Sequence, residues 1–363
     1  MDLVHRPFAV VRAGVSAGKR GHRRPTARPR PAPAYPAGME QRALAGHEVS
    51  VVGLGTWQLG SDWGDVDEDS ALDVLDAAIG AGVTFLDTAD VYGDGRSERL
   101  IGRWLAAHPG SGVMVATKMG RRVEQRVENY SSDAMRAWND RSRENLGVDT
   151  LDLVQLHCPP TALYAVDAVF DDLDAMVAEG RMAAYGVSVE TCDEALTAIA
   201  RPNVASVQII LNALRLKPLE RVLPAAAAAG VGIIARVPLA SGLLSGRYDE
   251  TTTFATDDHR TYNRHGEAFD QGETFSGVPY EVGLEAVDRL RGIVPTDATM
   301  AQFALRWIID QPGVTTVIPG ASRVSQAQAN AAAASLAPLT AEQQDACREV
   351  YDEFIREHVH GRW

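Results

Sequence analysis

The sequence predicts an α/β protein folded as a closed (β/α)8 barrel, a TIM barrel, in one domain with long βα loops and a C-terminal helix. Short apolar, β-branched runs alternate with amphipathic helical segments, which is typical of a parallel sheet with right-handed crossovers. Six such units would suit a doubly wound sheet, whereas eight favour a barrel, which typically takes ~250 residues. Eight runs follow residue 38, at 49–53, 84–87, 113–117, 151–157, 183–189, 206–211, 232–237 and 315–318.

The segments between the runs have helical periodicity. In one of them the apolar residues fall on a single helical face and a glycine, Gly180, stands where a C-terminal cap belongs. Two stretches exceed what a plain barrel needs: a long polar loop at 246–279 followed by a helix near 281–292, and a C-terminal helix at about 341–357. Since long βα loops lie over the mouth of a barrel, the 246–279 loop is a candidate substrate lid.

Composition excludes several classes of protein. Hydrophobic residues make up 45% and charged residues 23%, as in an average globular chain. Three cysteines without a C-x-x-C pair exclude a disulfide scaffold and a cysteine-based zinc site, and as packing thiols they suit a reducing, cytoplasmic location. No run approaches the length of about 18 apolar residues that a membrane helix needs. The net charge of −13 disfavours nucleic acid or an anionic membrane as a partner.

The first 38 residues differ from the rest. They contain eight Lys or Arg, one acid and six prolines, a net charge of +7 that leaves −20 on residues 39–363. Such a segment cannot bury enough apolar surface to fold, so we expect a disordered arm. It resembles a transit peptide or a nucleic-acid-binding tail. The interpretation we favour is a start codon placed too early, with Met39 as the true beginning, because the strand pattern starts just after it.

Polar side chains stand where three successive runs end. Asp87 ends the second run, Lys118 follows the third, His157 ends the fourth, and Tyr92 is on the loop after Asp87. Each alone has an ordinary structural explanation: a helix cap, a solvated amine or a packed ring. At one barrel mouth, however, the ammonium would lower the pKa of the phenol, and the carboxylate would keep the ammonium charged.

Such a group of side chains suits protonation of a carbonyl oxygen while a nucleophile attacks the carbon. No Ser, Cys or metal cluster in the sequence presents itself as that nucleophile. Hydride from a nicotinamide would fit, because protein side chains cannot supply hydride. We therefore expect an oxidoreductase without a metal, acting on a small aldehyde or ketone.

Several motifs now follow one another at a recognisable spacing: G-L-G-T-W at 53–57, D-T-A-D-V-Y-G at 87–93, G-R-S-E at 95–98, Lys118, His157, G-V-S at 186–188, P-L-A-S-G-L-L-S-G-R at 238–247 and I-P-G-A-S at 318–322. From Met39 to about Leu336 the chain resembles the aldo-keto reductases, within them most of all the bacterial oxidoreductases and potassium-channel β-subunit-like proteins. The resemblance implies a TIM barrel without a Rossmann domain, NADP(H) bound extended across the mouth, and reversible interconversion of carbonyl and alcohol.

The resemblance also implies roles for single residues. Tyr92 would be the general acid, Lys118 and Asp87 its tuning pair, and His157 the orienting or proton-sharing group. Ser188 and Gln208 would hold the nicotinamide carboxamide. The full set implied to contact the cofactor is Gly55, Thr56, Trp57, Asp87, Ser188, Gln208, Arg236, Pro238, Leu239, Gly242, Leu244, Arg247, Gly320, Ser322, Arg323, Gln326 and Asn330.

A physical argument supports the last part of this set, the segment implied to bind the 2′-phosphate and adenine. A Gly-rich strand end leading into a helix offers free N–H groups and a positive dipole to an anion, and Arg323 adds a fork of donors. This favours NADP(H) over NAD(H). The chain departs from the family's usual pattern at three positions: Val189 replaces Asn, Ala329 replaces an acid near the adenine, and Arg236 replaces an aromatic residue that stacks on the nicotinamide. A guanidinium can also stack on such a ring.

Other interpretations stay open at this point. Trp57 and Trp63 each either face the pocket or fill the core, with the pocket favoured for Trp57, and Ser97 is expected to cap a helix. A redox-sensing NADPH-binding subunit and, less favoured, a Schiff-base aldolase using Lys118 are alternative functions. Arg121, Arg122 and Arg126 would either attract an acidic substrate or form a solvated basic face. Neither the substrate nor the oligomeric state can be read from the sequence.

Overall fold

The computed structural model describes residues 38–60, 66–256 and 258–363. Apart from Gly38, the predicted N-terminal arm lies outside the described residues, and so does Trp63. None of the helices in these ranges is long and apolar enough to cross a membrane.

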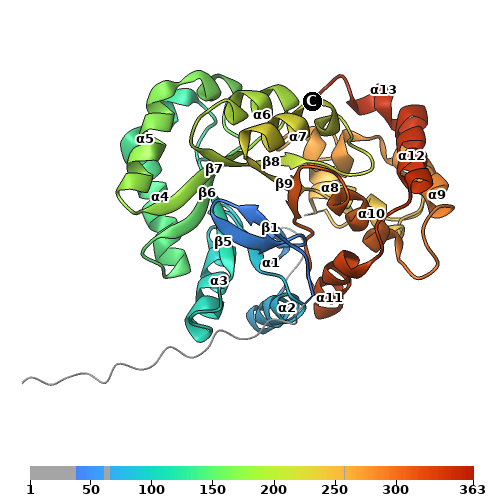
Figure 1. The fold of residues 1–363 in the computed structure, drawn as a ribbon, viewed down its shortest axis with the longest axis horizontal. Helices are drawn as coiled ribbons and strands as arrows, with labels where there is room; N and C mark the ends of the chain where they lie inside the picture. The colour runs from blue at the N-terminus through green and yellow to red at the C-terminus, as the bar shows by residue number, and fades with distance from the viewer. Residues whose placement is uncertain (1–37, 61–65, 257) are drawn as a thin grey trace, which may run out of the picture. The chain divides into compact units, whose positions relative to one another are not determined.

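Eight parallel strands form the barrel (Figure 1). Neighbouring strands pair in chain order, and isolated bridges between Val52 and Val317 and between Gly55 and Gly320 join the last strand to the first. The predicted (β/α)8 barrel is therefore confirmed. The strands are β3 (Leu54–Gly55), β4 (Phe85–Asp87), β5 (Met114–Met119), β6 (Leu151–His157), β7 (Met182–Ser188), β8 (Val204–Ile210), β9 (Gly232–Arg236) and β10 (Val314–Val317).

One strand prediction is wrong. Residues 49–53 were expected to be the first barrel strand, but His47–Ser50 is β2 of a hairpin with β1 (Gln41–Leu44), and the barrel strand comes later, at Leu54–Gly55. Ala45 and Gly46 both have positive φ, 50° and 81°, which allows a two-residue turn. Leu44 and Val49 of the hairpin join the apolar cluster inside the barrel, together with Phe85, Met114, Ala116, Leu153, Ile234 and Ile318.

Helices between the strands form the outer layer, and a larger apolar cluster lies between them and the sheet. These helices are α2 (Glu68–Gly80), α3 (Arg96–Ala107), α4 (Ser132–Leu146), α5 (Asp167–Ala178), α6 (Cys192–Ile199), α7 (Pro218–Ala229), α10 (Met300–Ile309) and α11 (Val324–Ala332). Helix α7 shows typical start and stop signals, since Pro218 is its first residue and Gly230, with the left-handed φ of a C-cap, follows its last.

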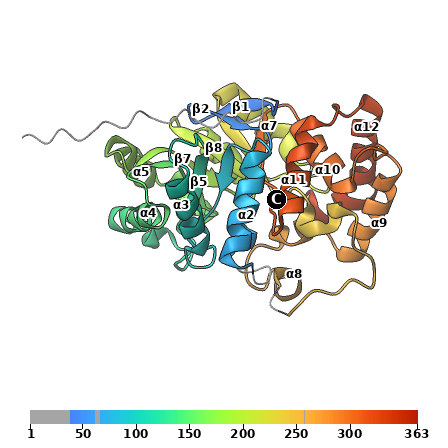
Figure 2. The same ribbon diagram turned by 90° about the horizontal axis from the view of Figure 1, so that it is seen from below.

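The two surplus stretches have the expected place in the chain. The 246–279 loop contains α8 (His259–Tyr262) and the short turns η4 (Gln271–Glu273) and η5 (Phe275–Gly277), and α9 (Tyr280–Arg291) follows it. The C-terminal helix is α12 (Ala341–Val350), continued by a π-helical turn (Tyr351–Ile355) and α13 (Arg356–Val359). Figure 2 shows the β1–β2 hairpin on the side of the barrel away from α8. The short helix α1 (Trp57–Gly60) follows β3.

Candidate active site

A cavity of about 1010 Å³ lies where the barrel strands end. Strand ends, the 246–279 loop and the start of α11 all contribute to its wall. It brings together almost all the residues that the sequence predicted for the site: Gly55, Thr56, Trp57, Asp87, Tyr92, His157, Ser188, Gln208, Arg236, Pro238, Leu239, Gly242, Arg247, Gly320, Ser322, Arg323, Gln326 and Asn330.

Two predicted residues do not line the cavity. Lys118 lies behind it and is only 1% exposed. Leu244 is fully buried in the hydrophobic core. Two residues with positive φ, Ser241 at 53° and Gly242 at 99°, interrupt the turn η3 (Ala240–Ser245) that contains Leu244. Because the turn is kinked there, Gly242 faces the cavity while Leu244 packs into the core.

Lys118 joins the carboxylate to the phenol. Its Nζ atom donates to Asp87 Oδ1 at 2.5 Å, to the backbone oxygen of Thr88 at 3.0 Å and to Tyr92 Oη at 3.2 Å. Burial by itself lowers the pKa of Lys118, but the charge of Asp87 and the contact with Tyr92 outweigh it and raise the pKa above the usual 10.5. Lys118 therefore stays charged although it is buried.

The pKa of the phenol differs from the prediction. Burial raises the pKa of Tyr92 above its ordinary value of 10, and the lowering effect of Lys118 does not overcome this. The ammonium could be foreseen from the sequence, whereas the burial of the phenol depends on the folded barrel. Tyr92 therefore keeps its proton at neutral pH and is a hydrogen-bond donor with a cation 3.2 Å from its oxygen.

Two amides complete the surroundings of Asp87. Gln208 donates to Asp87 Oδ2 at 2.8 Å, and Gln155 donates to the same oxygen at 3.2 Å. The sequence assigned Gln208 to the nicotinamide carboxamide and missed Gln155 altogether. A signal was present, since Gln155 is two residues before His157 in an apolar strand, and alternate strand residues point to the same side. Together these bonds fix the carboxylate that pairs with Lys118.

His157 lies at an edge of the phenol. Its ring is 6.0 Å from the Tyr92 ring, centroid to centroid, at an interplanar angle of 85°. Burial, together with the nearby charges of Arg121 and Lys118, holds its pKa well below 6.5, so the imidazole is neutral. The buried Nδ1 atom has no hydrogen-bond partner among the described residues. Of the two predicted roles, orienting a ligand oxygen fits a neutral ring better than supplying a proton.

Trp57 belongs to the pocket, as predicted. It lines the cavity and stacks on Tyr92, with centroids 6.1 Å apart and an interplanar angle of 21°. Its ring also meets the edge of Phe269 from the long loop, with centroids 6.1 Å apart. The indole therefore forms a wall between the candidate catalytic group and the loop above it.

Ser97 has another role than the predicted helix cap. Helix α3 begins after Gly95, whose φ of 83° makes the turn without a side-chain cap. The hydroxyl of Ser97 is buried and donates to Thr56 Oγ1 at 2.8 Å, and Thr56 in turn donates to the backbone oxygen of Asp87 at 2.8 Å. Ser97 thus helps to fix the backbone at Asp87.

The far end of the cavity is the start of α11. Arg323 is the N-cap residue and is exposed, and its guanidinium has no hydrogen bond or ion pair to a described residue. Gln326 accepts hydrogen bonds from the backbone N–H of Ser322 at 2.9 Å and from its hydroxyl at 3.1 Å. Asn330 donates to the backbone oxygen of Gly320 at 3.2 Å. A helix N-terminus without a side-chain cap, with a free guanidinium beside it, suits an anion.

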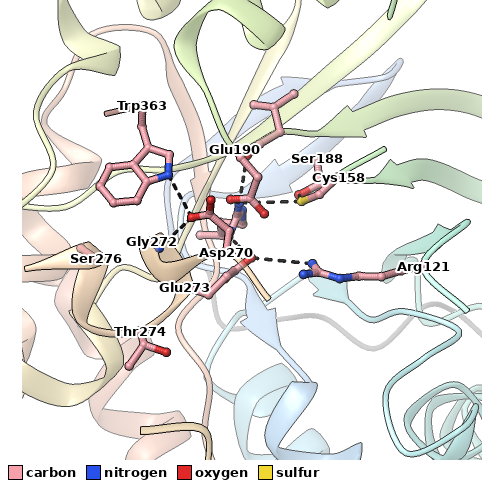
Figure 3. A network of polar contacts seen from close by, with 12 residues as sticks. Arg121, Cys158, Ser188, Glu190, Asp270, Gly272, Glu273, Thr274, Ser276 and Trp363 are labelled. Atoms are coloured by element: carbon pink, nitrogen blue, oxygen red, sulfur yellow. Dashed lines mark hydrogen bonds and ion pairs between the residues drawn. The ribbon is translucent and has the colours of Figure 1, made fainter. Parts of the chain in front are cut away.

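A second network of polar contacts, part of which Figure 3 shows, includes Arg121, Cys158, Glu190 and Glu273. Arg236 Nη2 donates to the backbone oxygen of Val189 and to Glu190, both at 2.9 Å, and Arg236 Nη1 is 2.5 Å from Glu273 of the long loop. The arginine that replaces the family's aromatic residue is thus held between two carboxylates. Burial raises the pKa of the neighbouring Cys158 thiol above its usual value of 9, as expected of a packing thiol.

The protein is a (β/α)8 barrel with a phenol, an ammonium, a carboxylate and an imidazole at its mouth. This combination is that of a class of TIM-barrel oxidoreductases. The chain belongs to the aldo/keto reductase family, whose model matches residues 51–352. Aldo-keto reductase str7 of Strobilurus tenacellus is 32% identical over 317 residues, which cover 84% of this chain and 89% of the relative. The channel-subunit-like branch stays a prediction.

Two solved structures have the same fold at similar identity. The glycerol dehydrogenase of Gluconobacter oxydans has a TM-score of 0.71 and 28% identity, with 88% of this chain and 96% of that chain covered. The holo form of an aldo-keto reductase from Bacillus halodurans has a TM-score of 0.70 and 27% identity, with 86% and 96% covered. The two chains and this one are therefore matched over nearly the whole barrel.

Proposed function

We propose that the protein is an NADP(H)-dependent carbonyl reductase that converts an aldehyde or ketone to an alcohol, with Tyr92 as general acid. The observation that carries the proposal is the position of Lys118 Nζ, 2.5 Å from Asp87 and 3.2 Å from the Tyr92 oxygen at the wall of a large cavity. When bound, the reduced nicotinamide supplies the hydride that no side chain can provide.

The residues present fit a dinucleotide phosphate. Arg323 and the N–H groups at the start of α11 suit the 2′-phosphate, and Arg247 adds a further positive charge to the cavity wall. At the other end Ser188 borders the cavity beside His157, since the two residues are paired across β6 and β7. This spacing of anion donors at one end and the candidate acid at the other supports an extended NADP(H).

The chain's own groups divide the work as follows. Tyr92 donates its proton to the carbonyl oxygen, and Lys118 stabilises the phenolate that remains. Asp87, fixed by two glutamines, keeps Lys118 charged. Neutral His157 orients the carbonyl oxygen. Asp87 and Tyr92 also border the cavity, so the acid and the substrate space are in contact.

The Schiff-base alternative is disfavoured by the same geometry. A nucleophilic lysine must be neutral and reach its substrate. Lys118 is 1% exposed, does not border the cavity, and its pKa is raised by Asp87 and Tyr92 against the effect of burial.

The proposal is tested with the purified full-length chain. A panel of aldehydes, sugars, quinones and pyridoxal is assayed with NADPH and with NADH by loss of nicotinamide absorbance, and the product alcohol is identified. We expect turnover of at least one carbonyl compound to be faster than release of NADPH measured by stopped flow in the absence of substrate. Tight NADPH binding with turnover of every compound slower than release of NADPH would favour the redox-sensing subunit, and absence of NADPH binding would contradict both. The proposed cytoplasmic location is a separate question for fractionation.

A further inference from the structure

Arg121 turns back into the cavity from the end of β5. Gly120, with a φ of 104°, provides the left-handed turn that separates it from the strand. Its side chain is 24% exposed, borders the cavity, and lies 5.7 Å from the Phe269 ring centroid. Figure 3 shows it reaching toward Glu273 from the opposite wall.

The donors of Arg121 are unused. It donates no hydrogen bond to any residue that the structure describes, and its ion pair with Glu273 is long, 3.9 Å. Glu273 is already 2.5 Å from Arg236, which also holds Glu190 at 2.9 Å. Two arginines and two glutamates balance in number, but both close contacts belong to Arg236. A guanidinium with five donors is thus left half-buried without a close acceptor.

The neighbouring arginines have no such position. Arg122 pairs with the carboxylate of Asp94, whose side chain is 75% exposed. Arg126 is 64% exposed and pairs with Glu124 at 2.7 Å. Of the three arginines in this loop, Arg121 alone borders the cavity. The basic loop is therefore a solvated face except at this one position.

Arg121 is close to the candidate reaction centre. Its charge is the second cause, after burial, of the lowered pKa of His157, and both residues border the cavity with Tyr92. A small molecule whose carbonyl oxygen reaches Tyr92 and His157 would place its far end near Arg121. An anion there would fill the unused donors in a partly desolvated site, where charge-assisted hydrogen bonds are strong.

We propose that Arg121 selects carbonyl substrates that carry an anionic group, a carboxylate or a phosphate, near the carbonyl. The inference rests on the proposed reductase function and names its substrate class.

The test compares matched substrates. Succinic semialdehyde and para-carboxybenzaldehyde are each assayed against their methyl esters, and glyceraldehyde phosphate against glyceraldehyde, with NADPH and the full-length protein. The phosphate arm separates the two sources of negative charge. We expect kcat/KM at least about tenfold higher for the anion in one of these pairs, the value of a good charge-assisted contact.

Variants assign the effect to Arg121. In Arg121→Gln the preference disappears because kcat/KM falls at least about tenfold further for the anion than for its neutral partner. The control Arg126→Gln, which removes an equal charge outside the cavity, keeps the preference. Equal rates for anion and neutral partner in the wild type, or an equal loss for both in Arg121→Gln, would overturn the inference and leave the reductase function intact.

A binding measurement separates this inference from the proposed function. Benzoate and benzamide are titrated into the protein saturated with NADP+, with calorimetry as the readout. We expect tighter binding of benzoate, lost in Arg121→Gln and kept in Arg126→Gln. If no aldehyde is reduced, this result still reports on Arg121. Equal affinity for benzamide and benzoate would contradict the anion site.

Discussion

Lys118 is the residue on which the electrostatics of the site depend. A buried ammonium ordinarily loses its proton, because desolvation disfavours the charged form. Here Asp87, Tyr92 and a backbone carbonyl accept from its Nζ atom, and Asp87 is itself held by two glutamine amides. The charge that stabilises a phenolate is therefore built into the fold before any ligand arrives.

Asp90, in the same motif as Asp87 and Tyr92, lowers the free energy of unfolding by an amount that depends on pH. Its carboxyl is fully buried, and neither oxygen has a hydrogen-bond partner among the described residues. Burial and the nearby Glu98 raise its pKa from 3.8 to about 7. At about pH 5 the Asp90 carboxyl is therefore protonated in the folded protein and ionised in the unfolded chain. The free energy of unfolding falls as the pH rises toward about 7, because the folded protein must then bury the charged carboxylate.

We predict that Asp90→Asn stabilises the protein more at about pH 8 than at about pH 5, since at the higher pH it removes a buried charge; with a folded pKa of about 7, the linkage limit for the difference between these pH values is about 3 kcal/mol. Urea unfolding at the two pH values measures the difference. Asp94→Asn, which changes an exposed carboxylate, serves as the control. An equal effect of Asp90→Asn at both pH values would show that Asp90 is not titrating in this range.

The candidate acid, its lysine, its carboxylate and its histidine could be predicted because strand ends of a barrel meet at one mouth. Gln155 was missed because an amide in an apolar strand has no distinctive chemistry until its partner is known. Burial raises the pKa of Tyr92, and the predicted lowering by Lys118 is present but smaller. The extent of burial could not be foreseen because it is a property of the folded barrel. Ser97 looked like a cap because its spacing fits one, but its hydroxyl bonds inward to Thr56.

Among the secondary-structure elements, the loop over the cavity is held by ion pairs and hydrogen bonds and also by one indole, that of Trp363. Trp363 donates from Nε1 to Asp270 at 2.9 Å, and the guanidinium of Arg215 lies 3.9 Å from its ring centroid. It packs so closely on Gly277 that a Cβ there would come within 2.3 Å of the ring. Trp363 thus holds η4 and η5, the segment that carries Glu273 to Arg236.

We predict that Trp363→Ala loosens this segment and costs about 3 kcal/mol of stability, the usual effect of emptying a buried aromatic site. Hydrogen exchange in residues 270–277 should increase, and NADPH should dissociate faster because the loop borders the cavity. Trp138→Ala, on the remote α4, is the control for loss of a tryptophan. Unchanged exchange in 270–277 would show that the loop is held by other contacts.

Helix α11 is the element that should choose the cofactor. We predict that Arg323→Leu weakens NADPH binding by about tenfold or more, the value of a charge-assisted contact, and leaves NADH binding unchanged. Fluorescence titration measures both constants. Arg348→Leu, which removes an exposed charge from α12, is the control. An equal loss for both dinucleotides would mean that Arg323 does not contact the 2′-phosphate.

The elements themselves were predicted with one main error. Seven of the eight barrel strands were placed by their apolar runs, whereas the first run, 49–53, begins with the last two residues of a hairpin strand and ends before the barrel strand at Leu54–Gly55. The Ala-Gly turn that makes the hairpin is not a strong turn signal, and Leu44 and Val49 read equally well as barrel residues. Leu244 was expected at the cavity because the left-handed conformation of Ala240 and Ser241 before it could not be read from the sequence.

For the whole molecule, the distribution of charge is the main physical feature. Residues 39–363 carry a net charge of −20, yet arginines 121, 236, 247 and 323 all border the one cavity that contains Tyr92. An acidic protein with a local basic cavity repels most anions and still concentrates those that fit inside. A dinucleotide phosphate and a small anionic substrate both fit that description.

The central claim is that Tyr92 supplies the proton in a reaction driven by nicotinamide hydride. It is tested most directly by single-turnover stopped flow on wild type and Tyr92→Phe, each loaded with NADPH and mixed with an aldehyde that the wild type reduces. We predict an unchanged dissociation constant for NADPH and an unchanged melting temperature, with hydride transfer slower by a factor of about 10²–10⁴. Transfer at the wild-type rate in Tyr92→Phe would contradict the account.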